Sequence, residues 1–249
     1  MHFYIYATHS QGYFENLLHS LHLFHAKYTI DGIGKTWHGY RQKLEGILQF
    51  AKKQQSNQVI CILDAFDSLL IRDPHTMEIS FRHSGKNIIY AHDHTFLYSN
   101  WFGKRYHEKK WGCARTLLNA GASIGYASTY VKIISRILEK LDRDHVQNEC
   151  VDDQRELCLY YKYHSSSDNL AIDQRSTFFY LTMGLKPMFP KQGLPFVISA
   201  PGKQSLRLYI IWLRLKYPTF YQNIPDEHVL TRWEKTILKW KRWKTIIPQ

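Results

Sequence analysis

The sequence predicts an α/β fold in which a mainly parallel central sheet is flanked by helices. Two observations predict this class. Short runs of almost purely apolar residues, such as Val59–Leu63, recur along the chain, and segments with apolar residues at helical spacing lie between them. Strands buried on both faces have this continuous apolar character because helices cover both sides of their sheet. With 249 residues, the chain is long enough to form one sizeable core.

The N-terminal part of the chain begins with an expected strand that is rich in aromatic residues, His2–Thr8. Apolar residues then recur at intervals of three and four from Gln11 to about Tyr28, which predicts a helix. Gly32 and Gly34 interrupt this pattern. A second helix is expected over Arg41–Gln54, because its apolar residues again share one face.

Three further strands are expected, and each is short and apolar. They are Val59–Leu63, Asn87–His92 and Ala122–Ala127, and an amphipathic helix follows from Val131 to Leu141. In open sheets of this class, ligands bind outside the carboxyl ends of the strands. The residues that directly follow Leu63 therefore occupy a place where function is expected.

The composition narrows the class of partner. The formal net charge of +12 indicates an anionic partner, which nucleic acid, phosphorylated small molecules and anionic membrane surfaces all satisfy. The four cysteines show neither a CxxC pair nor zinc-site spacing, so reduced thiols are expected. No run reaches the roughly 18 apolar residues of a membrane-spanning helix, and the N-terminus lacks the basic region of a secretory signal. These features predict a cytoplasmic protein.

Two pairs of aspartates are the main candidates for chemistry. Asp64 and Asp67 directly follow the apolar run Val59–Leu63. A single aspartate there is as often a helix cap or turn residue, but two neighbouring carboxylates repel each other, and a divalent cation bound to a diphosphate relieves that repulsion. Mg²⁺ and Mn²⁺ prefer such oxygen ligands. The second pair, Asp152 and Asp153, fits a helix start and a catalytic role equally well.

Five segments occur in an order that is similar to that of a known family. They are "YATHSQGY" with "GIGKTWHG", then "ILDAFDSLLI", "LLNAGASIGYAS", "DDQRELCLYY" and "AIDQRSTFF". Together they resemble the glycosyltransferase domain of procollagen lysyl hydroxylases and related collagen sugar transferases. The resemblance implies a GT-A-like nucleotide-sugar-binding fold over residues 1–205, with a UDP-sugar as donor and Mn²⁺, or Mg²⁺, as cofactor.

The resemblance also implies roles for individual residues. Asp64 and Asp67 would hold the metal. Asn119, Asp152 and Asp153 would face the transferred sugar and the acceptor. The residues beside the donor would be Ala7, Thr8, Trp37, Lys43 and Phe66. The implied reaction is the transfer of a hexose, glucose or galactose, to a hydroxyl of a glycan, a glycolipid or a glycosylated protein side chain, with retention of the anomeric configuration.

Two positions depart from the family pattern. In "FVISAPG", Ser199 stands where the family has a metal-binding histidine, and Ala122 stands where the family has glycine. A neutral hydroxyl is a poorer ligand than imidazole, so metal would bind more weakly or rely on the diphosphate and water. Lys203 follows closely enough in the sequence to suggest a contact with the diphosphate.

A second class of function fits these departures. It is a non-catalytic module with a degenerate metal site that binds a nucleotide sugar or a nucleic acid. The net charge of +12 and the aromatic residues favour nucleic acid. The sequence lacks the usual recognition motifs and this reading leaves both aspartate pairs unexplained, so we do not expect a nucleic-acid partner.

Residues 206–249 form a basic and aromatic C-terminal extension, which we expect to be helical and packed on the domain 1–205. On a helix, its apolar residues form one stripe, and lysines and Arg242 crowd the other faces. This pattern is typical of an interfacial helix on an anionic membrane surface, and equally of a helix that packs on its own domain. The stripe consists of Leu230, Trp233, Ile237 and Trp240.

Overall fold

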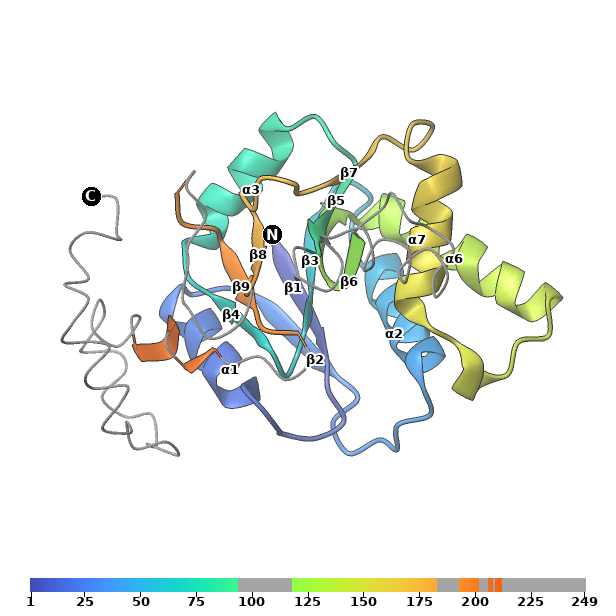
Figure 1. Cartoon of the computed structure of the whole chain (residues 1–249), viewed down its shortest axis with the longest axis horizontal. Coiled ribbons are helices and arrows are strands. Elements are labelled where there is room, and N and C mark those ends of the chain that lie inside the picture. The colour runs from blue at the N-terminus through green and yellow to red at the C-terminus, as the bar shows by residue number, and fades with distance from the viewer. Residues whose placement is uncertain (94–117, 183–192, 202–205, 208, 212–249) are drawn as a thin grey trace, which may run out of the picture.

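The computed structural model describes residues 1–93, 118–182, 193–201, 206–207 and 209–211 (Figure 1). The elements of this part, in order, are β1 (His2–Tyr6), α1 (Phe14–Leu23), β2 (Tyr28–Asp31), α2 (Tyr40–Lys52), β3 (Val59–Asp64), β4 (Ser68–Leu70), α3 (Pro74–His83), β5 (Ile88–His92), β6 (Leu118–Tyr126), α6 (Ala127–Arg143), the 3₁₀ turn η1 (Asn148–Cys150), α7 (Asp153–His164), β7 (Leu170–Ile172), β8 (Phe179–Leu181) and β9 (Val197–Ser199).

The described strands form a central sheet with the order β2-β1-β3-β6-β5-β7 and a small sheet with the order β4-β9-β8. In the central sheet, β1 runs parallel to β2 and β3, and β5 runs parallel to β7. Strand β6 lies between β3 and β5 and runs antiparallel to both. The predicted α/β class with a mainly parallel sheet is therefore confirmed, and the antiparallel strand β6 makes this sheet a mixed one. A continuous apolar run shows that a strand is buried but carries no information on its direction.

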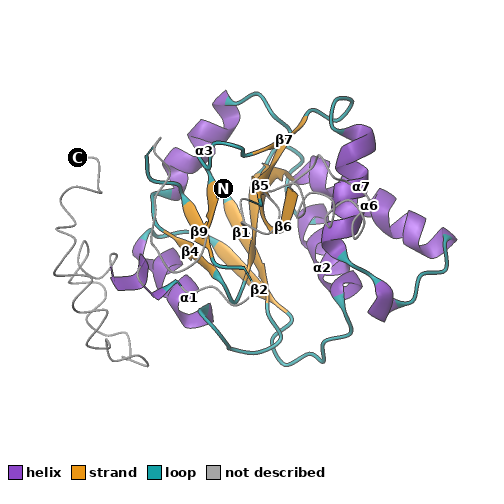
Figure 2. Ribbon diagram, in the orientation of Figure 1, coloured by secondary structure: helices purple, strands orange, loops and turns teal. Residues whose placement is uncertain are grey.

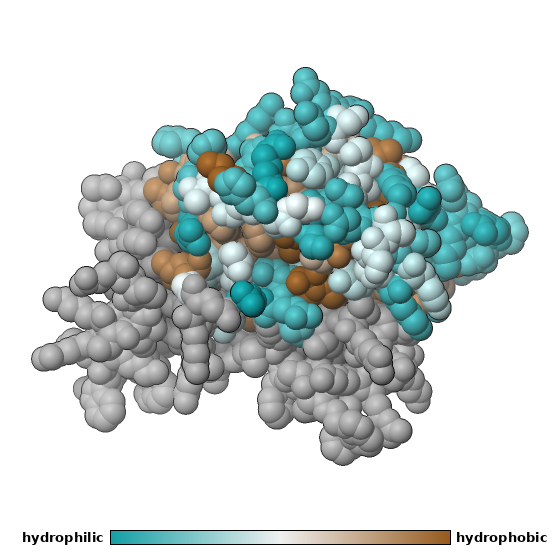
Figure 3. All heavy atoms as spheres, turned by 90° about the horizontal axis from the view of Figure 1, so that it is seen from above, coloured by the Kyte–Doolittle hydropathy of each residue, from teal (hydrophilic) through white to brown (hydrophobic). Residues whose placement is uncertain are grey.

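Helices cover both faces of the central sheet (Figure 2). Side chains alternate along β1, so Phe3 and Ile5 join the cluster under α1 and α3, whereas Tyr4 joins the cluster under α2, α6 and α7. The solvent-facing sides of α2, α6 and α7 are polar. The end of the molecule near the α6–α7 connection is almost wholly hydrophilic in Figure 3. The sheet is thus buried on both sides, as its apolar strands require.

Several elements differ from the sequence-based expectation in length. The first helix ends at Leu23, and Tyr28, expected at its end, begins the edge strand β2. Strand β6 begins at Leu118, before the expected Ala122. Strands of three or four residues, such as β2 and the three strands of the small sheet, are too short to show a periodic pattern, so only tertiary pairing defines them.

The chain beyond β9 contacts the small sheet. Leu206, Tyr209 and Ile210 lie in one buried cluster with Leu69 and Ile198. Residues 212–249, which contain the predicted stripe, lie outside the described residues. Among the residues that are described, no helix is long and apolar enough to cross a membrane.

Candidate active site

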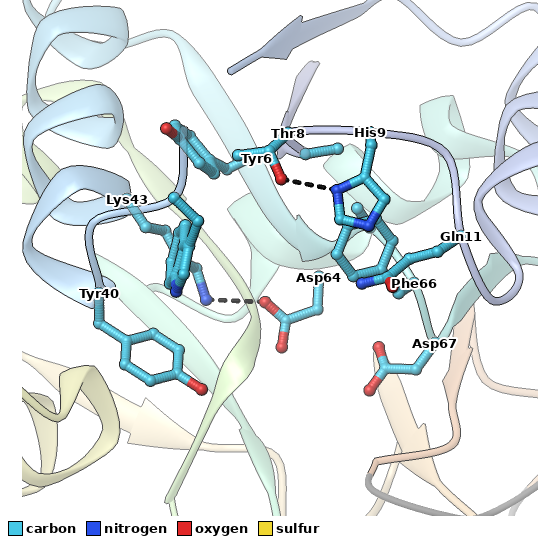
Figure 4. Close-up of a pocket in the computed structure, with 12 residues that line it drawn as sticks. Tyr6, Thr8, His9, Gln11, Tyr40, Lys43, Asp64, Phe66 and Asp67 are labelled. Carbon is cyan, nitrogen blue, oxygen red and sulfur yellow. Dashed lines mark hydrogen bonds and ion pairs between the residues drawn. The ribbon is translucent and has the colours of Figure 1, made fainter. Parts of the chain in front are cut away.

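A cavity of about 340 Å³ opens where β1 and β3 end (Figure 4). These parallel strands pair Tyr6 with Asp64, so the residues that follow both strands meet at one edge of the sheet. This is the place where open α/β sheets bind their ligands. The lining residues are Tyr6, Ala7, Thr8, His9, Gln11, Trp37, Tyr40, Lys43, Asp64, Ala65, Phe66 and Asp67.

Lys43 on α2 bridges two carboxylates. Its Nζ lies 2.7 Å from Asp64 Oδ1 and 3.0 Å from Asp153 Oδ2. Burial lowers the pKa of Lys43, but the charges of Asp153 and Asp64 outweigh this effect and raise it above its ordinary value, so the ammonium stays charged. Only 8% of the side chains of Lys43 and Asp153 is exposed, against 41% for Asp64. Lys43 and Asp64 both line the cavity, and Asp64 is the more exposed of the two.

The surroundings of Asp67 disfavour its charged form. Burial and the nearby Asp64 carboxylate raise the pKa of Asp67 to about 7. Ser68 Oγ donates a hydrogen bond of 3.3 Å to Asp67 Oδ1, and Figure 4 shows the Asp67 carboxylate beside that of Asp64 at the cavity. A divalent cation here would favour the ionised form of Asp67.

The two carboxylates fit a hard divalent cation. Carboxylate oxygens are the ligands that Mg²⁺ and Mn²⁺ prefer, and Mg²⁺ usually completes its shell with water and substrate phosphates. Within the described ranges, there is no group of three or more His, Cys, Asp or Glu side chains that could hold a metal ion. Asp64 and Asp67 would therefore hold the ion only in part, which leaves coordination positions for a diphosphate.

Ser199 is connected to Asp67 through the hydroxyl of Ser68. Its Oγ lies 2.9 Å from Ser68 Oγ in a buried pair. Either hydroxyl can be the donor in this pair, because each serine carries one donor hydrogen and two acceptor lone pairs. The backbone N–H of Ala200 also donates to the Asp67 carbonyl oxygen at 2.8 Å. In this arrangement Ser199 supports Asp67 through Ser68 and does not line the cavity.

Strand β6 passes directly beside Asp64 at Gly121. A Cβ at this position would lie 2.6 Å from Asp64 Oδ2 and 2.9 Å from Asn119 Oδ1, so both side chains occupy space that only glycine leaves open. Asn119 Oδ1 accepts a hydrogen bond of 2.8 Å from the backbone N–H of Gly121. Asn119 therefore lies next to Asp64, although it does not line the cavity.

The second aspartate pair has two separate structural partners. Asp152 is the N-cap of α7, and its Oδ1 accepts a hydrogen bond of 3.0 Å from the backbone N–H of Arg155. Asp153 is buried and turned toward Lys43. Burial raises the pKa of Asp153, and Lys43 opposes this shift. The two carboxylates thus differ in environment although they are adjacent in sequence.

Aromatic rings form the two walls of the cavity. On one side, the Trp37 ring lies 5.8 Å from Tyr6 and 5.5 Å from Tyr40. On the other side, His9 lies 5.7 Å from Phe66, and Gln11 lies nearby (Figure 4). These spacings lie in the range of favourable ring contacts and leave flat apolar surfaces toward the cavity.

The structure brings most of the predicted donor and metal residues into this cavity. They are Ala7, Thr8, Trp37, Lys43, Asp64, Phe66 and Asp67. Asn119 and Asp153 lie one contact away, Asp152 caps α7, and Lys203 falls outside the described residues. Five lining residues were not predicted, although each lies at the end of a strand, in the loop that follows it, or at the start of a helix. They are Tyr6, His9, Gln11, Tyr40 and Ala65.

Comparison with solved structures places this fold among glycosyltransferases. A glycosyltransferase involved in the glycosylation of the major capsid of PBCV-1 is 13% identical, with 86% of this chain and 98% of that chain covered and a TM-score of 0.50. Galactosyltransferase LgtC, solved with donor and acceptor sugar analogs, is 12% identical, with 91% and 98% covered and a TM-score of 0.52. At such identities the likeness shows the fold alone, which is the GT-A fold. No curated protein matches the chain.

A family model gives the more specific assignment. The model of the PLOD GT domain matches residues 2–185, which is well over half of the chain. This range contains both aspartate pairs and all residues that line the cavity. The chain therefore belongs to the PLOD GT domain family of glycosyltransferases.

Proposed function

We propose that this protein transfers a hexose, glucose or galactose, from a UDP-sugar to a hydroxyl of a glycan, a glycolipid or a glycosylated protein side chain, with Mn²⁺ or Mg²⁺ as cofactor and with retention at the anomeric carbon. One observation carries the proposal: Asp64 and Asp67 line a single cavity with aromatic walls, at the strand ends of a GT-A fold. Two carboxylates and flat rings match a ligand that has a metal-bound diphosphate and a base.

The cavity divides naturally between the parts of the donor. Asp64 and Asp67 would hold the cation, which, when bound, supplies positive charge to the phosphate that leaves. Phe66 and His9 offer ring faces for the uracil, and Ala7 and Thr8, which directly follow β1, would lie along the uridine. Trp37 forms part of the opposite wall. Lys203 would contact the diphosphate.

The residues next to the cavity suit the sugar and the acceptor. Asn119 lies beside Asp64 and would orient the transferred sugar, and Asp152 is partly exposed at the start of α7. Asp153 is ion-paired with buried Lys43, so it acts by holding Lys43 in place, and we assign it no role as a covalent nucleophile. Fixed charges of this kind stabilise developing charge without reorganisation during the reaction.

Calorimetric titration of UDP-glucose, UDP-galactose and UDP tests this proposal. Each is titrated into the purified chain with Mn²⁺ and again with EDTA. Manganese-dependent binding that favours one sugar is expected, and it identifies the donor for an acceptor screen. Absence of binding in both conditions contradicts the proposal. Binding that is equal with Mn²⁺ and with EDTA favours the non-catalytic module with a degenerate metal site, for which Ser199 in place of a histidine is the supporting feature. Salt-sensitive binding of single-stranded nucleic acid, unchanged by Asp67→Asn, would favour the basic binding module.

A further inference from the structure

We propose that Lys43 is the resident counter-ion of the candidate metal site. Its ammonium holds Asp64 when no divalent cation is present, gives up Asp64 when one binds, and keeps Asp153 in both states. The inference rests on the proposed function, because it assumes that the cation binds at Asp64 and Asp67. It concerns the affinity for the cation alone, so it is tested without a donor or an acceptor.

The contacts of Asp64 place Lys43 in competition with a cation. Lys43 Nζ lies 2.7 Å from Asp64 Oδ1, a distance typical of a strong charge-assisted hydrogen bond. The other oxygen, Oδ2, packs against Gly121 of β6. A cation that binds Oδ1 must therefore displace or share the ammonium, and two positive charges at contact distance repel each other.

The second partner explains why Lys43 remains in place. Asp153 Oδ2 lies 3.0 Å from Lys43 Nζ, and both side chains are only 8% exposed. A buried charge without a partner is strongly unfavourable, so this pair persists whatever happens at Asp64. Asp64, at 41% exposure, is the partner that water and ions reach. The network thus has one permanent half and one exchangeable half.

Once a divalent cation is added, each positive charge in the cluster is matched by carboxylate charge. Three carboxylates, Asp64, Asp67 and Asp153, surround one ammonium. A divalent cation balances Asp64 and Asp67, and Lys43 balances Asp153. An ammonium has three N–H donors, so Lys43 then has a donor free for an anionic oxygen in the cavity. Cation binding is in this way linked to the start of α7 through Asp153.

The sharpest test removes the counter-ion without changing the net charge. The double variant Lys43→Met/Asp153→Asn deletes one positive and one negative group and leaves Asp64 unpaired. We expect it to bind Mn²⁺ about tenfold more tightly than the wild-type chain in calorimetric titration without nucleotide. The control is Lys35→Gln/Asp31→Asn, which deletes an ion pair of 2.8 Å outside the cavity and is expected to leave the Mn²⁺ dissociation constant within about twofold.

A second variant keeps the proposal testable if the double variant does not fold, which circular dichroism reports. Asp153→Asn alone leaves Lys43 wholly on Asp64, and we expect Mn²⁺ to bind several-fold more weakly. A purely structural role of Lys43 would lower the unfolding temperature of the double variant without tightening Mn²⁺ binding.

Two outcomes overturn the inference, and they differ from failure of the proposed function. The inference is wrong if the folded double variant binds Mn²⁺ no more tightly than the wild type, including the case in which neither binds it. It is also wrong if Asp153→Asn binds Mn²⁺ as tightly as the wild type or more tightly. The proposed function is decided separately, by whether the wild-type chain binds a UDP-sugar.

Discussion

The two aspartate pairs look alike in sequence and differ in the folded protein. Asp152 caps α7 through the N–H of Arg155, and Asp153 is buried against Lys43. At the other pair, Asp64 shares Lys43 and faces the cavity, while Asp67 has its pKa raised to about 7 by burial and by Asp64. Asp152 and Asp153 have their partners within the fold, whereas Asp64 and Asp67 lie together at a cavity, where like charges raise the pKa of a carboxyl group.

Removal of one cavity carboxylate gives the largest expected difference between the pairs. In Asp67→Asn, Mn²⁺-dependent binding of UDP or UDP-sugar is expected to weaken at least about 100-fold, since even outer partners of metal ligands contribute 10- to 100-fold. Calorimetry measures this loss. The matched change Asp152→Asn retains a good N-cap and is expected to alter donor binding by no more than about twofold. Equal losses in both variants would end the distinction between the pairs.

The pH dependence of Mn²⁺ binding follows from the raised pKa of Asp67. Below about pH 7 a cation must displace the proton on Asp67, so the affinity is expected to fall by up to about tenfold per pH unit. Without the cation, the free energy of unfolding falls as pH rises from about 4 to about 7, because the folded chain binds the proton that the unfolded chain has lost. Titrations and denaturant unfolding between pH 5 and 8 check both signs, and Asp67→Asn should remove both dependences.

A methyl group at Gly121 tests the space that Asp64 occupies. Gly121→Ala places a Cβ 2.6 Å from Asp64 Oδ2, and we expect about tenfold weaker Mn²⁺ binding together with a loss of ~1–3 kcal/mol in stability. Gly125→Ala in the same strand is the control, since its Cβ would meet Ile88 at 2.8 Å, away from the aspartates. It is expected to lower the stability alone. Equal effects of the two changes on Mn²⁺ affinity would show that Asp64 does not depend on this space.

The smallest expected effect concerns the cap of α7. Asp152→Ala loses the hydrogen bond to the N–H of Arg155 and is expected to lower the free energy of unfolding by ~1 kcal/mol, whereas Asp152→Asn lowers it by a few tenths at most. Urea unfolding measures both. A loss of UDP binding in Asp152→Ala at unchanged stability would instead place Asp152 among the donor ligands.

Much of the fold was predictable because the burial of an element produces a pattern of apolar residues within that element's own sequence. Apolar runs and helical spacing predicted β1, β3, β5, α2 and α6 close to their observed places, and the aspartates after Leu63 predicted where the cavity lies. The direction of β6 and the short strands of the small sheet were not predictable. They depend on pairing between segments far apart in the sequence, which leaves no periodic pattern in either segment.

The sequence by itself determined the class of fold, the family and the position of the two carboxylates at a strand end, because these depend on composition and on short segments. Only the tertiary structure decided how the charges pair. Lys43, Asp64 and Asp153 come from α2, β3 and α7, and their contacts of 2.7 and 3.0 Å exist only once these elements pack together. The energies of charges depend on distance and burial, and spacing along the chain specifies neither.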